Sequence, residues 1–281
     1  MQIPNFHTKE EKFKFLKDHK QDLIASKKYQ PKHADAICYG VPLSNSKGEA
    51  VKSDSTMEGE DVGILKALVV INTTNILDSH GDVHIPGLWN KSLKEVKNMY
   101  LLQEHRMTFD KIIADSLKNN LKASVKNYEW SKLGFPEYEG KTQALVFDSE
   151  IDSNRNAYMF EQYRKGYVTE HSVGMQYVNM FLCINSTEKY FVEEKQNWDK
   201  YISEVANKQD AINEGNFWAV TEAKLIEGSA VVRGSNFATP TISISNTTES
   251  GKSTTEEIEP LNSTQKQVES VYYLVNNLNL K

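Results

Sequence analysis

The sequence is short of cysteine and of long apolar runs, and each shortage excludes a class of protein. Its two cysteines, Cys38 and Cys183, can form neither a disulfide framework nor a four-thiolate zinc site, and they fit a reducing compartment. No apolar run approaches the roughly 18 residues that a membrane-spanning helix needs. The opening residues MQIPNFHTKEEK lack an apolar signal core, so we expect no export.

The sequence also lacks an excess of positive charge. Lys and Arg total 33 against 38 Asp and Glu, which gives a formal net charge of −5. No general attraction to nucleic acid is therefore expected. Aromatic residues make up 10% and charged residues 25% of the 281 residues, an ordinary globular composition that excludes wholesale disorder. We expect a protein of the cytoplasm that binds neither nucleic acid nor membrane.

Three stretches of different composition divide the chain. Residues 1–62 form a mostly polar N-terminal extension, and residues 243–281 form a second polar extension at the other end. Between them, residues 63–242 carry most of the apolar runs. The composition predicts one folded core with an appendage at each end.

The two appendages contain recognisable local patterns. Lys9 to Ser26 has apolar residues at helical spacing among many lysines, and predicts an amphipathic helix. Ser44 to Asp61 is rich in Ser, Gly, Glu and Asp and predicts a loop. Ser243 to Ser263 is rich in Ser, Thr and Glu and predicts a flexible linker, and the spacing from Val268 to Leu278 predicts a short helix.

The core alternates strand-like and helix-like segments. β-branched or alternating runs predict strands at residues 64–74, 121–128, 142–151, 167–180 and 217–232. Helical patterns occur at residues 86–98, 153–164 and 187–213. The core is therefore predicted to be mainly β with helices (α+β), as a closed or nearly closed sheet.

Three residues of this core could carry chemistry. Ser172 lies on the side of its strand opposite the packing face, with the small Gly174 beside it clearing space for a substrate. His105 ends an apolar strand, where a sheet presents residues to a cleft. Glu227 lies in the apolar run LIEGSAVV, where an inward carboxylate needs a partner such as histidine. Taken alone, each also fits an ordinary surface or core position.

A second arrangement of reactive residues occurs in the segment DSHGDVH. Asp78, His80, Asp82 and His84 fall at every second position, so on an extended segment they would share one side and could face a metal ion. The spacing matches no zinc signature, and Gly81 favours a turn instead. No metal site is therefore predicted, and a metal-dependent hydrolase remains an alternative.

Four segments between residues 63 and 240 together resemble a known family. In order they are NILDSHGDVHIPGLWNKSL, LLQEHR, RKGYVTEHSVGMQY and AKLIEGSAVVRGSNFATP. They are similar to the D-x-x-G-D-x-x-x-P-G-x-(aromatic)-x-x-S-L stretch, the apolar run ending in the catalytic histidine, the K-x-G…S-(I/V)-G-(F/Y) block and the L-x-E-V-S-(L/V)-V…A-N-P-A block of the caudoviral prohead proteases. These are capsid-maturation serine proteases related to herpesvirus assemblins.

The resemblance implies a serine endopeptidase with a β-barrel protease core. Ser172 matches the nucleophile, His105 the general base and Glu227 the third, orienting member of a triad. The substrates would be the scaffold protein, the major capsid protein and the protease itself, inside the assembling prohead in the host cytoplasm. The resemblance implies no cofactor. Because related viral proteases dimerise, it leaves a homodimer open.

The sequence departs from the family pattern at two of these segments. The fourth segment reads Glu-Gly-Ser-Ala where the family has Glu-Val-Ser-Leu, and Met175 replaces the usual aromatic residue. Glu222 is therefore kept as the reserve third member, and Arg233 as a contributor to oxyanion stabilisation. The alternative function is a catalytically inactive capsid-assembly or scaffold-associated protein with the same fold.

Overall fold

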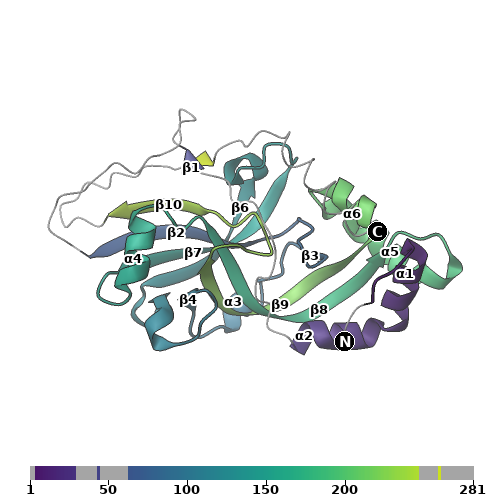
Figure 1. Cartoon of the computed structure of the whole chain (residues 1–281), viewed down its shortest axis with the longest axis horizontal. Coiled ribbons are helices and arrows are strands. Elements are labelled where there is room, and N and C mark those ends of the chain that lie inside the picture. The colour runs from purple at the N-terminus through teal and green to yellow at the C-terminus, as the bar shows by residue number, and fades with distance from the viewer. Residues whose placement is uncertain (1–3, 30–42, 45–62, 247–258, 261–281) are drawn as a thin grey trace.

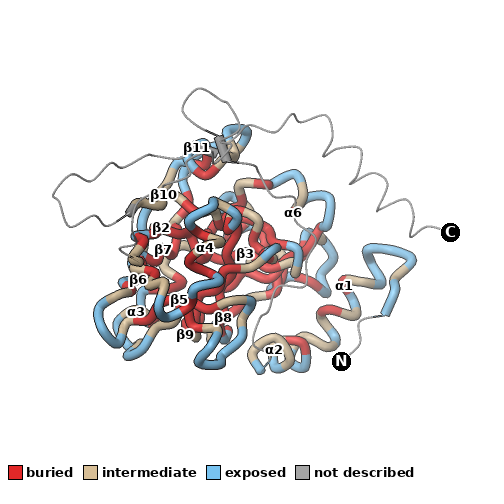
Figure 2. Tube along the Cα trace, turned by 60° about the vertical axis from the view of Figure 1, so that its left-hand side comes forward, coloured by how far each residue is buried: buried red, intermediate tan, exposed pale blue. Residues whose placement is uncertain are grey.

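The structure is a computed structural model that describes residues 4–29, 43–44, 63–246 and 259–260. Its described part consists mainly of two open β-sheets with helices around them (Figure 1). Strands of both sheets contribute to one large apolar cluster, which includes Leu65, Phe147, Tyr177 and Val220. Figure 2 shows buried residues concentrated along these strands and exposed residues in the surrounding turns and helices.

The first sheet contains four antiparallel strands in the order β10–β2–β7–β6. Their bounds are Thr241–Asn246 for β10, Ile64–Thr73 for β2, Lys141–Asp152 for β7 and Leu121–Glu129 for β6. β2 carries the apolar run of the core and is buried along most of its length. β6 lies at the edge and alternates with exposed lysines, which suits a strand with one face in water.

The second sheet is organised around β9 (Asn216–Val231). β8 (Glu170–Ile184) pairs antiparallel with one edge of β9 along its whole length. Two short strands, β3 (Asp82–His84) and β4 (Tyr100–Gln103), pair parallel with the other edge, and β5 (Ile112–Asp115) pairs with β4. β9 therefore lies between the strand that carries Ser172 and the strand that leads to His105.

The predicted closed or nearly closed β-barrel is wrong. Among the described residues, β6 pairs only with β7 and β5 pairs only with β4, so both sheets end in open edges. The four-residue β5 is too short, and β6 too polar, to continue a ladder around a closed sheet. The two sheets are linked locally, because His171 N donates to Thr239 O and Val70 N donates to Pro240 O.

Six α-helices lie among the described residues. Their bounds are Lys9–Asp18 (α1), Lys20–Tyr29 (α2), Ser92–Glu95 (α3), Ala157–Arg164 (α4), Val192–Tyr201 (α5) and Lys208–Glu214 (α6). α4 begins at the N-cap Asn156, whose side chain accepts a hydrogen bond from Met159 N. α5 and α6 occupy the connection between β8 and β9. No described helix has the length and apolar character needed to cross a membrane.

The N-terminal helices pack against the far end of the β8–β9 ribbon (Figure 1). The predicted single helix is divided at His19, which caps α1 before α2 begins. Lys17 and Lys20 both pair with Glu194 of α5, whose side chain is 1% exposed. Lys27 of α2 pairs with Asp82 of β3, whose side chain is fully buried. Buried carboxylates of the core thus hold this part of the N-terminal extension in place.

Several sequence predictions concern residues that the structure describes only in part. Most of the predicted loop at Ser44–Asp61, most of the predicted linker at Ser243–Ser263 and the predicted helix at Val268–Leu278 lie outside the described residues. The described start of that linker is strand β10, which runs to Asn246 and pairs with β2. The predicted core boundary after residue 242 therefore falls inside a strand. Leu43–Ser44 (β1) and Glu259–Pro260 (β11) form a two-residue pair.

Candidate active site

His105 lies in a tight left-handed turn directly after β4. Glu104 has φ 52° and His105 has φ 56°, a conformation that L-residues adopt at a steric cost. Two backbone bonds support the turn, from Glu104 N to Ala230 O at 2.9 Å and from Arg106 N to Gln103 O at 3.0 Å. The chain thereby turns away from the direction of β4 while it is still next to β9. His105 contacts the Glu227 carboxylate of β9 at this point.

His105 and Glu227 form a buried hydrogen-bonded pair. Nδ1 of His105 lies 2.6 Å from Oε1 of Glu227, and their side chains are 8% and 4% exposed. An ionised carboxylate only accepts hydrogen bonds, so Nδ1 carries the proton of this pair. In the neutral imidazole Nε2 is then the basic nitrogen. This is the tautomer that a histidine general base requires.

The second oxygen of Glu227 is also engaged. Ser229 Oγ donates to Glu227 Oε2 at 2.5 Å and accepts from the backbone N of His105 at 3.1 Å. Ser229 is fully buried, and it lies on the same face of β9 as Glu227 because the two are two positions apart on the strand. Sequence reasoning assigned Ser229 no role, although it is the serine of the Glu-Gly-Ser-Ala segment.

Gly174 provides the space that the Glu227 carboxylate occupies. Gly174 of β8 pairs with Glu227 of β9, and a Cβ atom on Gly174 would lie 2.0 Å from Glu227 Oε1. The expectation that this glycine clears space for a substrate is therefore corrected: the Glu227 side chain fills the position that a larger residue would take. A glycine in a strand commonly marks such a close approach.

Ser172 lies on the same sheet face as this network. It pairs directly with Ser229 across the β8–β9 ladder, and it precedes Gly174 by two residues. Its exposed fraction is 6%, so it is buried beside the pair rather than displayed to solvent. Ser172 thus lies on β8, Glu227 on β9 and His105 in the turn that follows β4. β9 is the middle strand of the three.

Ser172 fits the nucleophile better than the neighbouring Ser229. The Ser229 hydroxyl already donates its one proton to Glu227 and accepts from a backbone amide. A serine that donates to the orienting carboxylate does not donate to the basic nitrogen of the histidine. Ser172 is the other serine on this face, one strand further from Glu227.

The opposite side of the Ser172 strand is held by a separate buried network. Tyr163 OH of α4 lies 2.9 Å from His171 Nε2, and His171 Nδ1 lies 3.2 Å from Thr239 O. The carbonyl can only accept, so Nδ1 donates to it and Nε2 accepts from the tyrosine. Burial lowers the pKa of His171 from 6.5 to about 4, and the bond to Thr239 offsets this only in part. His171 is therefore neutral.

Glu222, the reserve third member, makes its ion pair with a lysine and not with His105. Glu222 pairs with Asn179 in the ladder, and its carboxylate contacts Lys91 Nζ at 3.1 Å rather than His105. Arg233 is exposed beyond the end of β9. Burial raises the pKa of Glu170, and the bond from Gly234 N and the charge of Arg233 lower it in part. Arg233 thus acts electrostatically on Glu170, two residues before Ser172.

The candidate metal-binding residues are contacted by a lysine, Lys27. Ligand atoms of Asp78, His80 and Asp82 lie within 4.8 Å of one another. Asp82 Oδ1 contacts Lys27 Nζ at 2.5 Å, and Asp82 Oδ2 accepts from Tyr177 OH at 2.8 Å. Both Asp82 oxygens therefore already have a partner, and one of these is a positively charged ammonium group.

His84 is not one of those three residues, but it shares the partner Tyr177 with Asp82. Its ring nitrogens lie 2.9 Å from Asn72 Nδ2 and 3.1 Å from Tyr177 OH. Asp78 Oδ1 instead accepts from the backbone N of His80 and of Asp82, which closes the turn around Gly81 (φ +71°). The turn at Gly81 therefore separates Asp78 and His80 from Asp82 and His84, and the latter two share one side of β3 against Tyr177.

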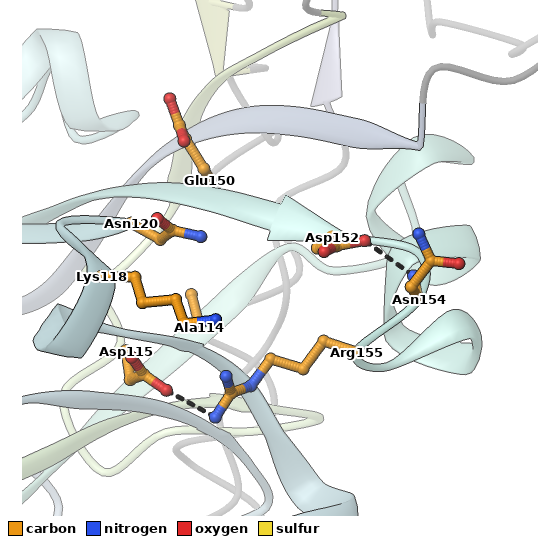
Figure 3. Close-up of a pocket in the computed structure, with 8 residues that line it drawn as sticks. All are labelled: Ala114, Asp115, Lys118, Asn120, Glu150, Asp152, Asn154 and Arg155. Atoms are coloured by element: carbon orange, nitrogen blue, oxygen red, sulfur yellow. Dashed lines mark hydrogen bonds and ion pairs between the residues drawn. The ribbon is translucent and has the colours of Figure 1, made fainter.

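A polar pocket lies away from the candidate triad. It has a volume of about 240 Å³ and is crossed by an ion pair between Asp115 and Arg155 at 2.5 Å (Figure 3). Lys118, Asn120 and Asp152 also line it. Asp115 pairs with Tyr100 at the start of β4, whereas His105 follows the end of that strand. The pocket therefore contributes nothing to the His105 network.

Comparisons with protein-family models, with curated proteins and with solved structures found no match to this chain.

Proposed function

We propose that the chain is a serine endopeptidase that cleaves segments of the scaffold and major capsid proteins, and itself, during phage prohead maturation. The observation that carries the catalytic part is the buried His105–Glu227 pair beside the strand of Ser172. The choice of substrates rests on the four ordered segments that resemble the prohead proteases. Each part has its own test.

The proposed reaction uses the three side chains in succession. Ser172 Oγ attacks the scissile carbonyl carbon while His105 Nε2 accepts the hydroxyl proton. The imidazolium donates this proton to the amine nitrogen as the C–N bond breaks, which leaves an acyl ester on Ser172. Water then attacks the ester, and its proton returns through Nε2 to the serine oxygen as the acid product leaves. Glu227 stays ionised and keeps Nδ1 as a donor throughout.

Co-expression with the capsid and scaffold proteins of the same virus tests the proposed substrates. The wild-type chain should shorten both proteins, and mass spectrometry of the products should locate the cleavage sites. Ser172→Ala and His105→Ala should each lower turnover by about 10⁶-fold, because the two residues act as one unit. Normal processing by either variant would contradict the proposal. Normal shell assembly without any cleavage would identify the inactive assembly protein instead.

Self-cleavage offers a test that needs no second protein. The stretch Ser243–Ser263 begins inside β10, so we expect cleavage only beyond Asn246, where a composition rich in Ser, Thr and Glu favours proteolysis. We expect the active chain to lose its C-terminal residues within it, and the Ser172→Ala chain to keep its full intact mass. A shortened variant for the activity test should end at Asn246, because β10 ends there. Truncation after Pro240 would remove the edge strand that pairs with β2.

A further inference from the structure

We propose that Ser229 is a positioning residue, which fixes both the Glu227 carboxylate and the backbone of His105 for catalysis. This inference rests on the proposed function, because it concerns the same site. Ser229 is not the nucleophile and need not contact substrate. It connects the strand that carries Glu227 to the left-handed turn that carries His105.

The contacts of Ser229 divide its hydroxyl group between the two partners. The hydroxyl proton goes to Glu227 Oε2, while His105 Nδ1 binds the other oxygen of the same carboxylate. A carboxylate with one donor on each oxygen cannot rotate about its terminal bond without breaking a hydrogen bond. The Ser229 oxygen also accepts a hydrogen bond from the backbone N of His105. His105 lies in a left-handed turn whose conformation has a steric cost.

Both contacts act on the direction of the imidazole ring. The Glu227 oxygen sets the orientation of the ring from Nδ1, and the backbone bond sets the place from which the side chain starts. Nε2 reaches a substrate or nucleophile only if both are correct. Active-site groups need such support because small misplacements cost much rate.

An ordinary packing role for Ser229 predicts different behaviour. Ser149 of β7 is also fully buried, and its hydroxyl makes no hydrogen bond to any described residue. Ser149 therefore shows what a buried strand serine looks like when its hydroxyl positions nothing. Ser149→Ala is the matched control for Ser229→Ala, since both remove one buried hydroxyl from a strand.

The experiment measures the rate at which a fluorophosphonate probe labels Ser172. Ser229→Ala should lower the second-order labelling rate constant by about 10- to 100-fold, the effect expected for a hydrogen bond to a charged group. Ser149→Ala should leave it unchanged. Ser229→Cys has nearly the same size and a weaker donor, so its rate should lie between those of wild type and Ser229→Ala.

A double variant separates positioning from packing. In a Glu227→Gln background, Ser229→Ala should slow labelling less than it does in the wild type, because the bond to the ionised carboxylate is already lost and only the bond from His105 N remains to be removed. Equal slowing in both backgrounds, or a wild-type rate for Ser229→Ala, would overturn the role of Ser229 while the proposed function stands. Failure of the wild-type chain to label at Ser172 would instead refute the proposed function, and this inference with it. If Ser229→Ala folds poorly, Ser229→Cys is labelled in its place. A wild-type labelling rate for Ser229→Cys would equally overturn the role of Ser229.

Discussion

Gly174→Ala should destabilise the protein because the new methyl group displaces the Glu227 side chain. The new Cβ atom would lie 2.0 Å from Glu227 Oε1, against an ordinary contact distance that starts at 3.4 Å. The end of the Glu227 side chain must therefore move by more than 1 Å. Such a movement breaks its 2.6 Å bond to His105 Nδ1, because a hydrogen bond weakens beyond about 3.2 Å.

The magnitude follows from two opposing effects. Replacing a strand glycine by alanine without a clash stabilises the fold by about 0.5–1 kcal/mol. Loss of a hydrogen bond to a charged group costs about 1.5–3 kcal/mol. The net expectation for Gly174→Ala is a loss of roughly 1–2 kcal/mol in the free energy of unfolding. In a Glu227→Ala background the obstacle is gone, so the same change should stabilise by about 0.5–1 kcal/mol.

Urea unfolding of the four variants of this cycle measures both values. Gly228→Ala is the matched control, because its Cβ would lie 2.7 Å from Phe147 Cε2 and 3.0 Å from Ile71 Cδ1 in the core. Gly228→Ala should therefore destabilise by a similar amount whether or not Glu227 is present. An unchanged sign for Gly174→Ala in the two backgrounds would refute the reasoning.

Three further predictions concern other charged or titratable groups. His171 has a pKa of about 4 in the folded protein and 6.5 in the unfolded chain. The free energy of unfolding should therefore be highest above pH 6.5 and fall by about 3 kcal/mol towards pH 4. His171→Gln should flatten this pH dependence in urea unfolding. Glu227→Gln should lower turnover by about 10⁴-fold while Glu222→Gln has little effect, in cleavage of the co-expressed capsid and scaffold proteins. Lys27→Met should cost about 3–5 kcal/mol in thermal unfolding by leaving Asp82 buried and unbalanced, and adding Asp82→Asn should recover part of the loss.

The strands and the partner of Glu227 could be anticipated from local sequence. The run Ile64 to Thr74 appears as β2, because a continuous β-branched segment is stable only when buried on both faces. A carboxylate inside LIEGSAVV must have a partner, and the structure pairs Glu227 with His105. The sequence left Glu222 as a second option, which only the ladder register and the contact with Lys91 separate from Glu227.

Other features depend on contacts between distant segments, which no local pattern reveals. The helix expected at Pro86–Asn98 is reduced to Ser92–Glu95, because Gly87 has φ +89° and the chain first makes turns. The strand expected at residues 167–180 begins only at Glu170, and Tyr167 before it is 66% exposed. Closure of a sheet depends on edge pairing over the whole chain, so strand patterns alone wrongly suggested a closed sheet.

The same limit explains the missed roles of Gly174 and Ser229. A small residue beside a candidate nucleophile indicates a close approach, but not which side chain approaches. The approaching group is Glu227, 53 residues further along the chain. Ser229 is the serine of the Glu-Gly-Ser-Ala segment, but that position does not reveal what its hydroxyl contacts, which only its two hydrogen bonds show.

Mapping the residue that a fluorophosphonate modifies tests the central claim most directly. After labelling and proteolysis, mass spectrometry should find one adduct on the peptide that contains Ser172. The adduct should be absent in Ser172→Ala and should form far more slowly in His105→Ala, because Nε2 can no longer accept the serine proton. An adduct at Ser229, or labelling of Ser172 at an equal rate without His105, would contradict the assignment of this site as a serine protease triad.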